Sequence, residues 1–340
     1  MNWNSGYSSL FELKKVDPVS WLDAGSFDFT NGSINRTNSG LLESADLSMT
    51  ENPGECWIRI YLKARQEGGS DRIALFTGLT STPSRDIDGT RTSYPVEVYS
   101  VLKPVADVFV PLGYYAPAGA SAGELVADLL KVGAAPIVVD GESPVLIDAV
   151  VSEDDMSRLD MAWLILNAVG WRLRITGDGI VHIAPAADQV SAVFDTEDND
   201  VIENSITDSQ DWFSVPNCIR VISGDRHIEY KNEDPDDLTS TETRKKNRGG
   251  SGEIWMSDKS PTTGSNESLA EYSIRKLSEA QAPARKISYT RRYRPDVLPG
   301  DIVGLHLPVI GIDDTFKVES QTVELAYGCK TQEEVTYERI

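Results

Sequence analysis

The sequence has few cysteines, and it lacks a long apolar run. Its three cysteines, Cys56, Cys218 and Cys329, lie far apart without a CxxC pair, which fits neither a disulfide framework nor a zinc site. No apolar run reaches the ~18–20 residues that cross a bilayer, and the start has neither the basic nor the apolar region of a signal peptide. We therefore expect free thiols, no membrane span and no export.

Positive charge is also scarce. The chain of 340 residues has 32 Lys and Arg against 53 Asp and Glu, a formal net charge of −21. Sequence-independent binding to nucleic acid depends on a cationic surface that neutralises phosphates, so the acidic excess argues against binding of that kind. We also expect no specific nucleic-acid binding. Apolar and charged residues, at 40% and 25%, are in the ordinary range for globular proteins, and the length favours two or three domains.

Short strand-like segments with glycine-containing turns extend to about residue 115. Residues 57–62 (WIRIYL) are apolar on both faces of the expected strand, because Trp57 and Tyr61 flank Arg59 on one face and aliphatic residues occupy the other. Such a strand needs cover on both faces. We expect a packed neighbour over Trp57, Arg59 and Tyr61, either another domain or another subunit.

Residues 116–186 combine helical and strand patterns. A capping box that begins at Ser121 predicts one helix, and apolar residues at helical spacing predict a second from Ser152 to Gly170. Two strand-like segments around residues 176–179 (TGDG) then predict a hairpin. This stretch is typical of a small α+β unit.

A second β segment is expected from about residue 187, with an interruption at residues 232–284. The interruption begins with a polar loop that we expect to be mobile, and a helix follows at residues 267–280. In residues 315–327 the apolar positions change parity, and one strand cannot keep one buried face through that change. A β-bulge or bend near Ser320 is therefore predicted.

The sequence offers little that would carry catalysis. There is no GxSxG motif, and His182, His227 and His306 lie in strand-like surroundings without a metal-spaced partner. We expect no catalytic residue, no metal and no cofactor. A glycosidase with paired carboxylates stays open, because the separation of the pair is spatial.

One acidic run has partial calcium-loop spacing. Asp195, Glu197 and Asn199 occupy positions 1, 3 and 5 of such a loop. However, Asp200 replaces the turn glycine and Ile206 replaces the bidentate carboxylate. A solvated loop is favoured over a cation site.

A basic strand is predicted where Arg291, Arg292 and Arg294 lie among Tyr289 and Tyr293. Nucleic-acid stacking sites have this composition, but the tyrosines differ in parity from Arg292 and Arg294. In so acidic a protein we expect the three arginines to pair with an acidic neighbouring subunit. A solvated face and a nucleic-acid contact stay open as alternatives.

A second basic cluster precedes the glycine-rich residues 249–252. It comprises Arg244, Lys245, Lys246 and Arg248. The segment lacks the spacing of a P-loop and a following helix, so a phosphate cradle is not favoured. We interpret it as a flexible basic loop at the tip of the insertion.

Short motifs follow one another in a characteristic order along most of the chain. They are FELKKVDP at 11–18, Trp21, GSINR at 32–36, LESA at 42–45, WIRIY at 57–61, ALFTG at 74–78, SVLKP at 100–104, GYY at 113–115, IWM at 254–256 and LPGDIV at 298–303. None is catalytic, and their specificity comes from their order. In that order they resemble the tail hub proteins of bacteriophages, also called baseplate hub or late-control D-like proteins.

The resemblance implies a mainly β fold with α+β parts. Two tail-tube-like antiparallel β-barrels would flank an α+β domain, and the second barrel would contain a helix-containing insertion. The implied limits are 1–115 for the first barrel, 116–186 for the α+β domain, 187–231 with 285–340 for the second barrel, and 232–284 for the insertion.

The resemblance also implies a structural role in the virion rather than an enzyme. A homotrimer would join the hexameric tail tube to the tip or spike and enclose the DNA channel, after assembly in the host cytoplasm. Its partners would be the tail tube protein, distal tail or baseplate proteins, the tip or spike protein and the tape-measure protein.

Two other functions stay open. One is a carbohydrate-binding module of a tail tip or fibre, for which the seven tryptophans would supply sugar platforms. The other is a tail enzyme that degrades the cell wall.

Overall fold

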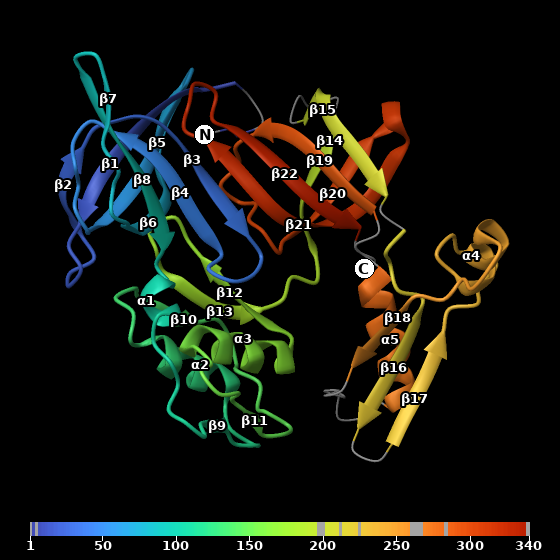
Figure 1. Ribbon diagram of the computed structural model, residues 1–340. Coiled ribbons are helices and arrows are strands. Elements are labelled where there is room, and N and C mark those ends of the chain that lie inside the picture. Colours follow the sequence, from blue (N-terminus) through green and yellow to red (C-terminus); the bar gives the residue numbers. More distant parts are fainter. Residues whose placement is uncertain are drawn as a thin grey trace.

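The computed structural model describes residues 2–3, 6–195, 201–210, 213–223, 226–258, 268–281 and 285–337. Figure 1 shows four groups of elements: an N-terminal β unit, an α+β unit beneath it, a second β unit beside the first, and an insertion that projects from the second β unit. None of the described helices is long and apolar enough to cross a membrane. All three cysteines are free, and two of them are buried.

The N-terminal β unit contains β1 to β8. Its strands follow the order β2-β1-β5-β6-β8-β4-β3, and the neighbouring strands in that order are antiparallel. Alternating apolar side chains from these strands form a common core. The bounds are β1 Ser8–Val16, β2 Asp23–Phe27, β3 Phe29–Thr37, β4 Glu43–Met49, β5 Trp57–Gln66, β6 Gly69–Thr80, β7 Asp86–Asp88 and β8 Arg91–Ser100.

The α+β unit follows the N-terminal unit in the chain. Its helices pack on a three-stranded sheet of order β10-β13-β12, and a two-stranded sheet of β9 and β11 lies at its far end (Figure 1). The bounds are α1 Lys103–Ala106, β9 Tyr115–Ala116, α2 Ala122–Leu130, β10 Ile137–Val139, β11 Val150–Val151, α3 Arg158–Val169, β12 Trp171–Ile175 and β13 Val181–Pro185.

The helix ends of this unit test the sequence predictions. Ser121 caps α2 and accepts a hydrogen bond from the backbone N–H of Glu124, as predicted. The predicted start of the second helix at Ser152 is wrong, because α3 begins after Ser157, whose hydroxyl accepts from the N–H of Asp160 at 3.0 Å. Its end at Gly170, with φ 69°, is confirmed.

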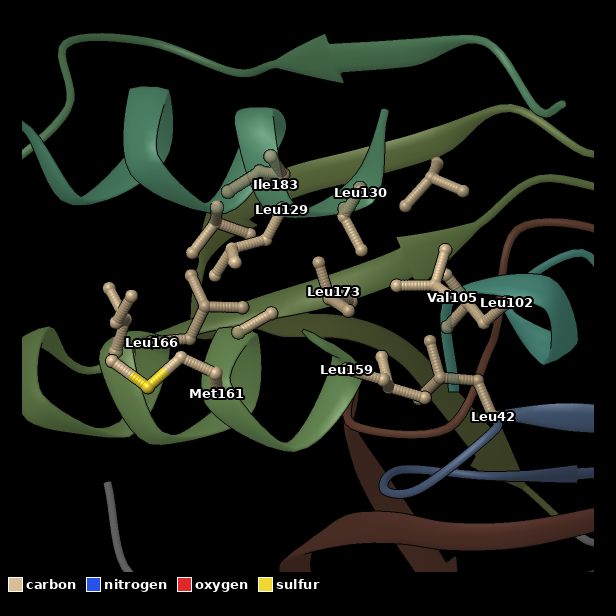
Figure 2. Close-up of a cluster of buried hydrophobic side chains, with 14 of the residues drawn as sticks. Leu42, Leu102, Val105, Leu129, Leu130, Leu159, Met161, Leu166, Leu173 and Ile183 are labelled. Atoms are coloured by element: carbon tan, nitrogen blue, oxygen red, sulfur yellow. The ribbon is translucent and has the colours of Figure 1, made fainter. Parts of the chain in front are cut away.

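The core of the α+β unit is continuous with the N-terminal β unit. Figure 2 shows leucines of α2 and α3 facing Leu173 and Ile183 of the small sheet, with Leu42 of the N-terminal unit at the edge of the same cluster. Trp57 and Val16 also belong to this cluster. The two units are therefore packed together rather than only linked by the chain.

The second β unit extends the sheet of the first. Strand β21 pairs antiparallel with β3, so one 14-stranded sheet runs through both units. This unit consists of β14 Val190–Asp195, β15 Val201–Gln210, β19 Arg285–Arg292, β20 Ile302–Leu307, the 3-10 helix η3 Pro308–Ile310, β21 Ile312–Glu324 and β22 Lys330–Tyr337. The mainly β class with an α+β unit is confirmed, but hydrogen bonds among the described strands close neither set into a barrel.

The predicted bend near Ser320 is confirmed. The register between β21 and β22 shifts between Val318 and Ser320, and the pairing of β21 with β3 begins at Ser320. The bulge thus lies where β21 leaves the second β unit and joins the first.

The insertion has a sheet of its own, in the order β17-β16-β18. Strands β16 and β17, expected in the second barrel, pair with β18 of the insertion instead, so its sheet begins before residue 232. Tyr272 and Leu277 of α5 cover Ile219 and Val221, and α5 is the helix expected at residues 267–280. The bounds are β16 Cys218–Ser223, β17 Arg226–Lys231, α4 Thr241–Arg248, β18 Trp255–Asp258 and α5 Leu269–Gln281.

The basic tip is helical rather than a flexible loop, which corrects the sequence interpretation. Ser240 caps α4 by accepting from the N–H of Thr243, and Gly249, with φ 72°, ends the helix. The pattern of a mobile loop came from polar composition, which a short, capped and mostly exposed helix shares.

The contact between the hairpin at 176–179 and β6 is close enough to test. A Cβ atom on Gly177 would lie 1.9 Å from the carbonyl oxygen of Ala74. We expect Gly177→Ala to lower the free energy of unfolding by about 1–3 kcal/mol, because the hairpin must move off β6. Gly69→Ala, whose Cβ would have nothing within 4 Å, is the matched control. Urea unfolding of both variants measures the difference, and equal stabilities would contradict this packing.

Candidate interaction surfaces

Arg59 lies at the contact between β5 and the hairpin of the α+β unit. Its Nε donates to the hydroxyl of Thr77 at 2.9 Å, and its Nη2 donates to the carbonyl of Asp178 at 2.8 Å. The side chain of Asp23 lies 3.5 Å from Nη1. Trp21 also donates to the Asp178 carbonyl, at 2.9 Å. One guanidinium thus binds three parts of the chain.

The aromatic face of β5 is covered by the chain itself. Trp57 packs 5.4 Å from Trp21 between ring centroids, and the guanidinium of Arg72 lies 3.4 Å from the centre of the Tyr61 ring. Of the side chains predicted at an interface, Trp57 is 7% exposed, Arg59 6% and Tyr61 9%. Cover by another domain is therefore the right alternative. The assignment of these residues to a subunit interface is corrected, because almost none of their surface is exposed.

Arg291 lies at the centre of a buried polar network in the second β unit. Its Nε donates to Oε2 of Glu333 at 2.8 Å, and its Nη2 contacts the other carboxylate oxygen. Gln321 donates to the same carboxylate at 2.6 Å and to the carbonyl of Val297 at 3.0 Å. Both charged side chains have no exposed surface. Bidentate geometry and the added amide offset the cost of burying two charges.

The three arginines predicted at an interface therefore differ in position: Arg291 and Arg292 lie on opposite faces of β19, and Arg294 follows the strand. Arg291 shares the buried face with Tyr289, so its assignment to a partner interface is also corrected. Arg292 is half-buried and lines a surface hollow beside Arg65 and Tyr327. Arg294 forms an ion pair with Asp296 at 2.6 Å. Contacts of Arg292 and Arg294 with a partner stay a prediction.

The four cations of the tip differ in exposure. Arg244 is buried and donates to the carbonyl of Phe213 at 3.4 Å, and Arg248 donates to the same oxygen at 3.0 Å. Lys245 and Lys246 are exposed. The arginines therefore fix α4 against residue 213, while the lysines face solvent.

Asp301 joins the α+β unit to the second β unit, and sequence reasoning did not single it out. It pairs with Arg172 at 2.8 Å and with Arg174 at 3.4 Å, both on β12, and its own backbone lies in the LPGDIV motif. Its side chain also accepts from the N–H of Leu298. The alternation of Arg172 and Arg174 on one strand was the only sequence signal for this contact.

The described residues offer little for the other functions considered. Among the described tryptophans only Trp255 is as much as 39% exposed, and Arg220 and Lys231 lie over its ring, so no exposed tryptophans gather as a sugar platform. No group of three or more His, Cys, Asp and Glu side chains in the described ranges could hold a metal ion. Of the acidic run at 195–200, all but Asp195 lies outside the described residues.

Comparison with solved structures gives matches over almost the whole chain. A tail protein from Neisseria meningitidis MC58 matches with a TM-score of 0.68 and 14% identity, covering 98% of this chain and 97% of that one. The 43 kDa tail protein of prophage MuSo2 from Shewanella oneidensis matches with a TM-score of 0.66 and 11% identity, covering 96% and 97%. The chain has the fold of these tail proteins.

A third match has the same character. The prophage tail protein gp18 from Listeria monocytogenes EGD-e gives a TM-score of 0.54 at 11% identity, over 96% of this chain and 94% of that one. No protein-family model matches the sequence, and a comparison with curated proteins finds no match. The resemblance inferred from the order of the short motifs is confirmed by this tail-protein fold.

Removal of Arg291 tests the buried network. We expect Arg291→Met to lower the free energy of unfolding by about 3–5 kcal/mol, because the Glu333 carboxylate would stay buried without its cation. The double variant Arg291→Met with Glu333→Leu should recover part of that loss. As a control, Arg220→Gln breaks an exposed pair with Glu229 and should cost less than about 1 kcal/mol. Urea unfolding measures these losses, and equal losses in Arg291→Met and Arg220→Gln would contradict the network.

A second buried ionisable side chain, Glu43, lies on β4 near the seam between the β units. Glu43 is paired with Arg36 at 3.8 Å, and Oε1 of Glu43 has no hydrogen-bond partner in the described residues. Burial raises the pKa of Glu43 to about 8, against the opposing effect of Arg36. The guanidinium of Arg36 also lies 5.9 Å from the ring of Tyr293 in the second β unit.

This carboxyl predicts a dependence of stability on pH. Because the folded pKa of Glu43 lies above the ordinary 4.5, the folded chain binds a proton that the unfolded chain releases between these values. The contribution of Glu43 to stability is full below pH 4.5 and decreases as the pH rises to about 8, by up to about 1.4 kcal/mol per pH unit. Glu43→Gln should flatten this slope and exceed the parent at alkaline pH. Urea unfolding across this range measures it, with the exposed Glu51→Gln as control, and parallel curves would contradict it.

Proposed function

We propose that this chain is a structural hub of a phage tail tip or baseplate, a homotrimeric adaptor between the tail tube and the tip or spike. The observation that carries the proposal is the match of 98% of the chain to a tail protein at a TM-score of 0.68. The motif order in the sequence supports the same conclusion independently of the fold. Localisation in the virion, after assembly in the host cytoplasm, belongs to this proposal.

The arrangement of the β units suits a symmetry adaptor. Each chain has two β units joined through β3 and β21. Three chains would present six such units, and each would act as a tube-like wall facing one subunit of a hexameric tube. In this proposal the two units complete their barrel-like form within the assembled ring, where neighbours pair with the strands at the ends of the sheet.

The acidic charge suits a channel for DNA. Three chains would carry three times the net charge of −21, and carboxylates on the inner wall would repel the phosphate backbone as DNA passes. Salt screens this repulsion beyond about 8 Å, so the effect would act close to the wall. The proposed protein therefore encloses DNA without binding it specifically.

The proposed partners fall on different parts of the chain. We assign Arg292 and Arg294 to contacts between subunits, and Lys245 and Lys246 to contacts of the projecting tip. The tail tube protein, distal tail or baseplate proteins, the tip or spike protein and the tape-measure protein complete the set. No enzymatic step is part of this function, in keeping with solved relatives that are named as tail proteins.

Mass measurement tests the trimer. We expect native mass spectrometry to give a species of about 112 kDa, three times the chain mass of 37.3 kDa, at high concentration or with the tube and tip proteins present. Arg292→Glu with Arg294→Glu should shift the population toward monomer, because each removes a proposed intersubunit cation. The exposed pair Arg85→Glu and Arg91→Glu carries the same charge change as control. A chain that stays monomeric with its partners present would overturn the trimeric hub.

A further inference from the structure

The far end of the α+β unit carries apolar side chains that the described parts of the chain leave exposed. Leu112 is 86% exposed, and Tyr115, Ile147 and Val151 are 60%, 59% and 61% exposed. We call these four residues the apolar ribbon. They lie at or beside β9 and β11, which form the end of the unit remote from the large sheet in Figure 1. An exposed apolar group of this kind marks an interaction site.

Backbone hydrogen bonds hold the ribbon in place. Val151 lies directly opposite Tyr115 in the antiparallel pair, so their side chains share one side of the strands. The N–H of Ser152 donates to the carbonyl of Tyr114 at 3.0 Å, and the N–H of Gly119 donates to the carbonyl of Leu146 at 2.7 Å. The side chains that project from this framework are therefore preorganised for binding, which lowers the entropic cost of association.

The surroundings of the ribbon are strongly acidic. From Asp107 to Asp155, the segment that contains the ribbon, the sequence has nine Asp or Glu and one cation, Lys131, while Arg158, whose charge acts on Tyr114, follows this segment. That lysine forms an ion pair with Asp128 at 3.1 Å. Asp148 and Glu153, next to Ile147 and near Val151, are exposed. The exposed apolar residues of the ribbon thus have exposed carboxylates as neighbours in the chain, which we call the acidic rim.

Charge complementarity indicates which kind of molecule would bind the apolar ribbon. A second copy of the same surface would bring two acidic rims together, and like charges across an interface oppose association. A segment with apolar residues on one face and Lys or Arg on the other would cover the apolar ribbon and pair with the acidic rim. Such a segment has the opposite charge to most of this chain.

We propose that the apolar ribbon docks a basic, amphipathic segment of a different protein. The inference goes beyond the hub assignment, since it concerns a surface on the α+β unit and no intersubunit contact. The acidic rim steers the segment and the four apolar side chains bind it. Binding weakens as salt rises, because the rim and its partner are exposed.

A peptide of defined chemistry tests the surface on the full chain. The probe is a fluorescent 20-residue helix of Leu and Lys with one apolar face, and a Leu and Glu helix of the same pattern is its counterpart. We expect fluorescence anisotropy to show binding of the basic helix alone. Leu112→Ser with Ile147→Ser should weaken it by about tenfold or more. Val19→Ser with Leu22→Ser, which removes side chains 92% and 67% exposed on the N-terminal unit, should leave binding unchanged.

Two double variants that remove the same charge at different places test the rim. Glu153→Gln with Asp154→Asn should weaken binding, whereas Glu51→Gln with Asp88→Asn, exposed on the N-terminal β unit, removes the same charge and should not. Equal effects of the two pairs would overturn the proposal in favour of attraction by the whole acidic chain. Unchanged binding in the Leu112 and Ile147 variant, with an unchanged unfolding midpoint, would also overturn it.

Self-association is the remaining outcome. If sedimentation shows that the Leu112 and Ile147 variant loses an oligomer that the parent forms, the occupant is a second copy and the proposal fails. The peptide assay uses the chain without tail partners. Its result is therefore separate from the mass measurement that tests the trimer.

Discussion

The whole molecule depends on the change of partner within strand β21. Its first half places Phe316 and Val318 in the core of the second β unit, and its last residues place Val323 in the core of the first. The bulge between Val318 and Ser320 makes this possible. It moves the buried side chains of the strand from even-numbered to odd-numbered positions where the pairing with β3 begins. One strand thus belongs to two cores, and the sheet continues without interruption.

The polar network fixes that change of register. Gln321 lies opposite Glu333 in the pairing of β21 with β22, and its amide completes the contacts that Arg291 makes with the carboxylate. A shift by one residue would place Gln321 on the other face and leave the buried charges incompletely bonded. Apolar packing alone would tolerate such a shift more easily near a bulge. The buried ion pair therefore specifies alignment at the seam, which is the role we infer for it rather than added stability.

Local sequence patterns were reliable where one segment decides its own structure. The parity change at Ser320, the cap at Ser121 and the end at Gly170 all follow from neighbours in the chain. Ser152 and Ser157 were equivalent as helix starts, since each has an Asp three residues later. Asp155 has φ 57°, a left-handed conformation that a right-handed helix from Ser152 could not pass through, so the helix begins only after Ser157.

The sequence did not reveal which distant segments of the chain pack against one another. Nothing local distinguishes β16 and β17 from strands of the large sheet, because sheet membership depends on which edge accepts them. Arg291 shares its parity with the buried Tyr289, and that parity was a usable signal for an inward guanidinium. The covering of Trp57 was predicted correctly as a need for a neighbour, but only the folded chain shows which neighbour meets it.

The use of cations inside the chain shapes the outer surface. Arg59, Arg172 and Arg291 each meet a carboxylate of the same chain at contacts between or within units. Each such pair is neutral, so the net charge of −21 resides on the remaining carboxylates, and exposed cations such as Lys245 and Lys246 are in the minority. Partners that approach most of this surface therefore meet a negative field, which favours basic ligands and disfavours DNA. The acidity noted in the sequence is thus a property of the surface that partners meet.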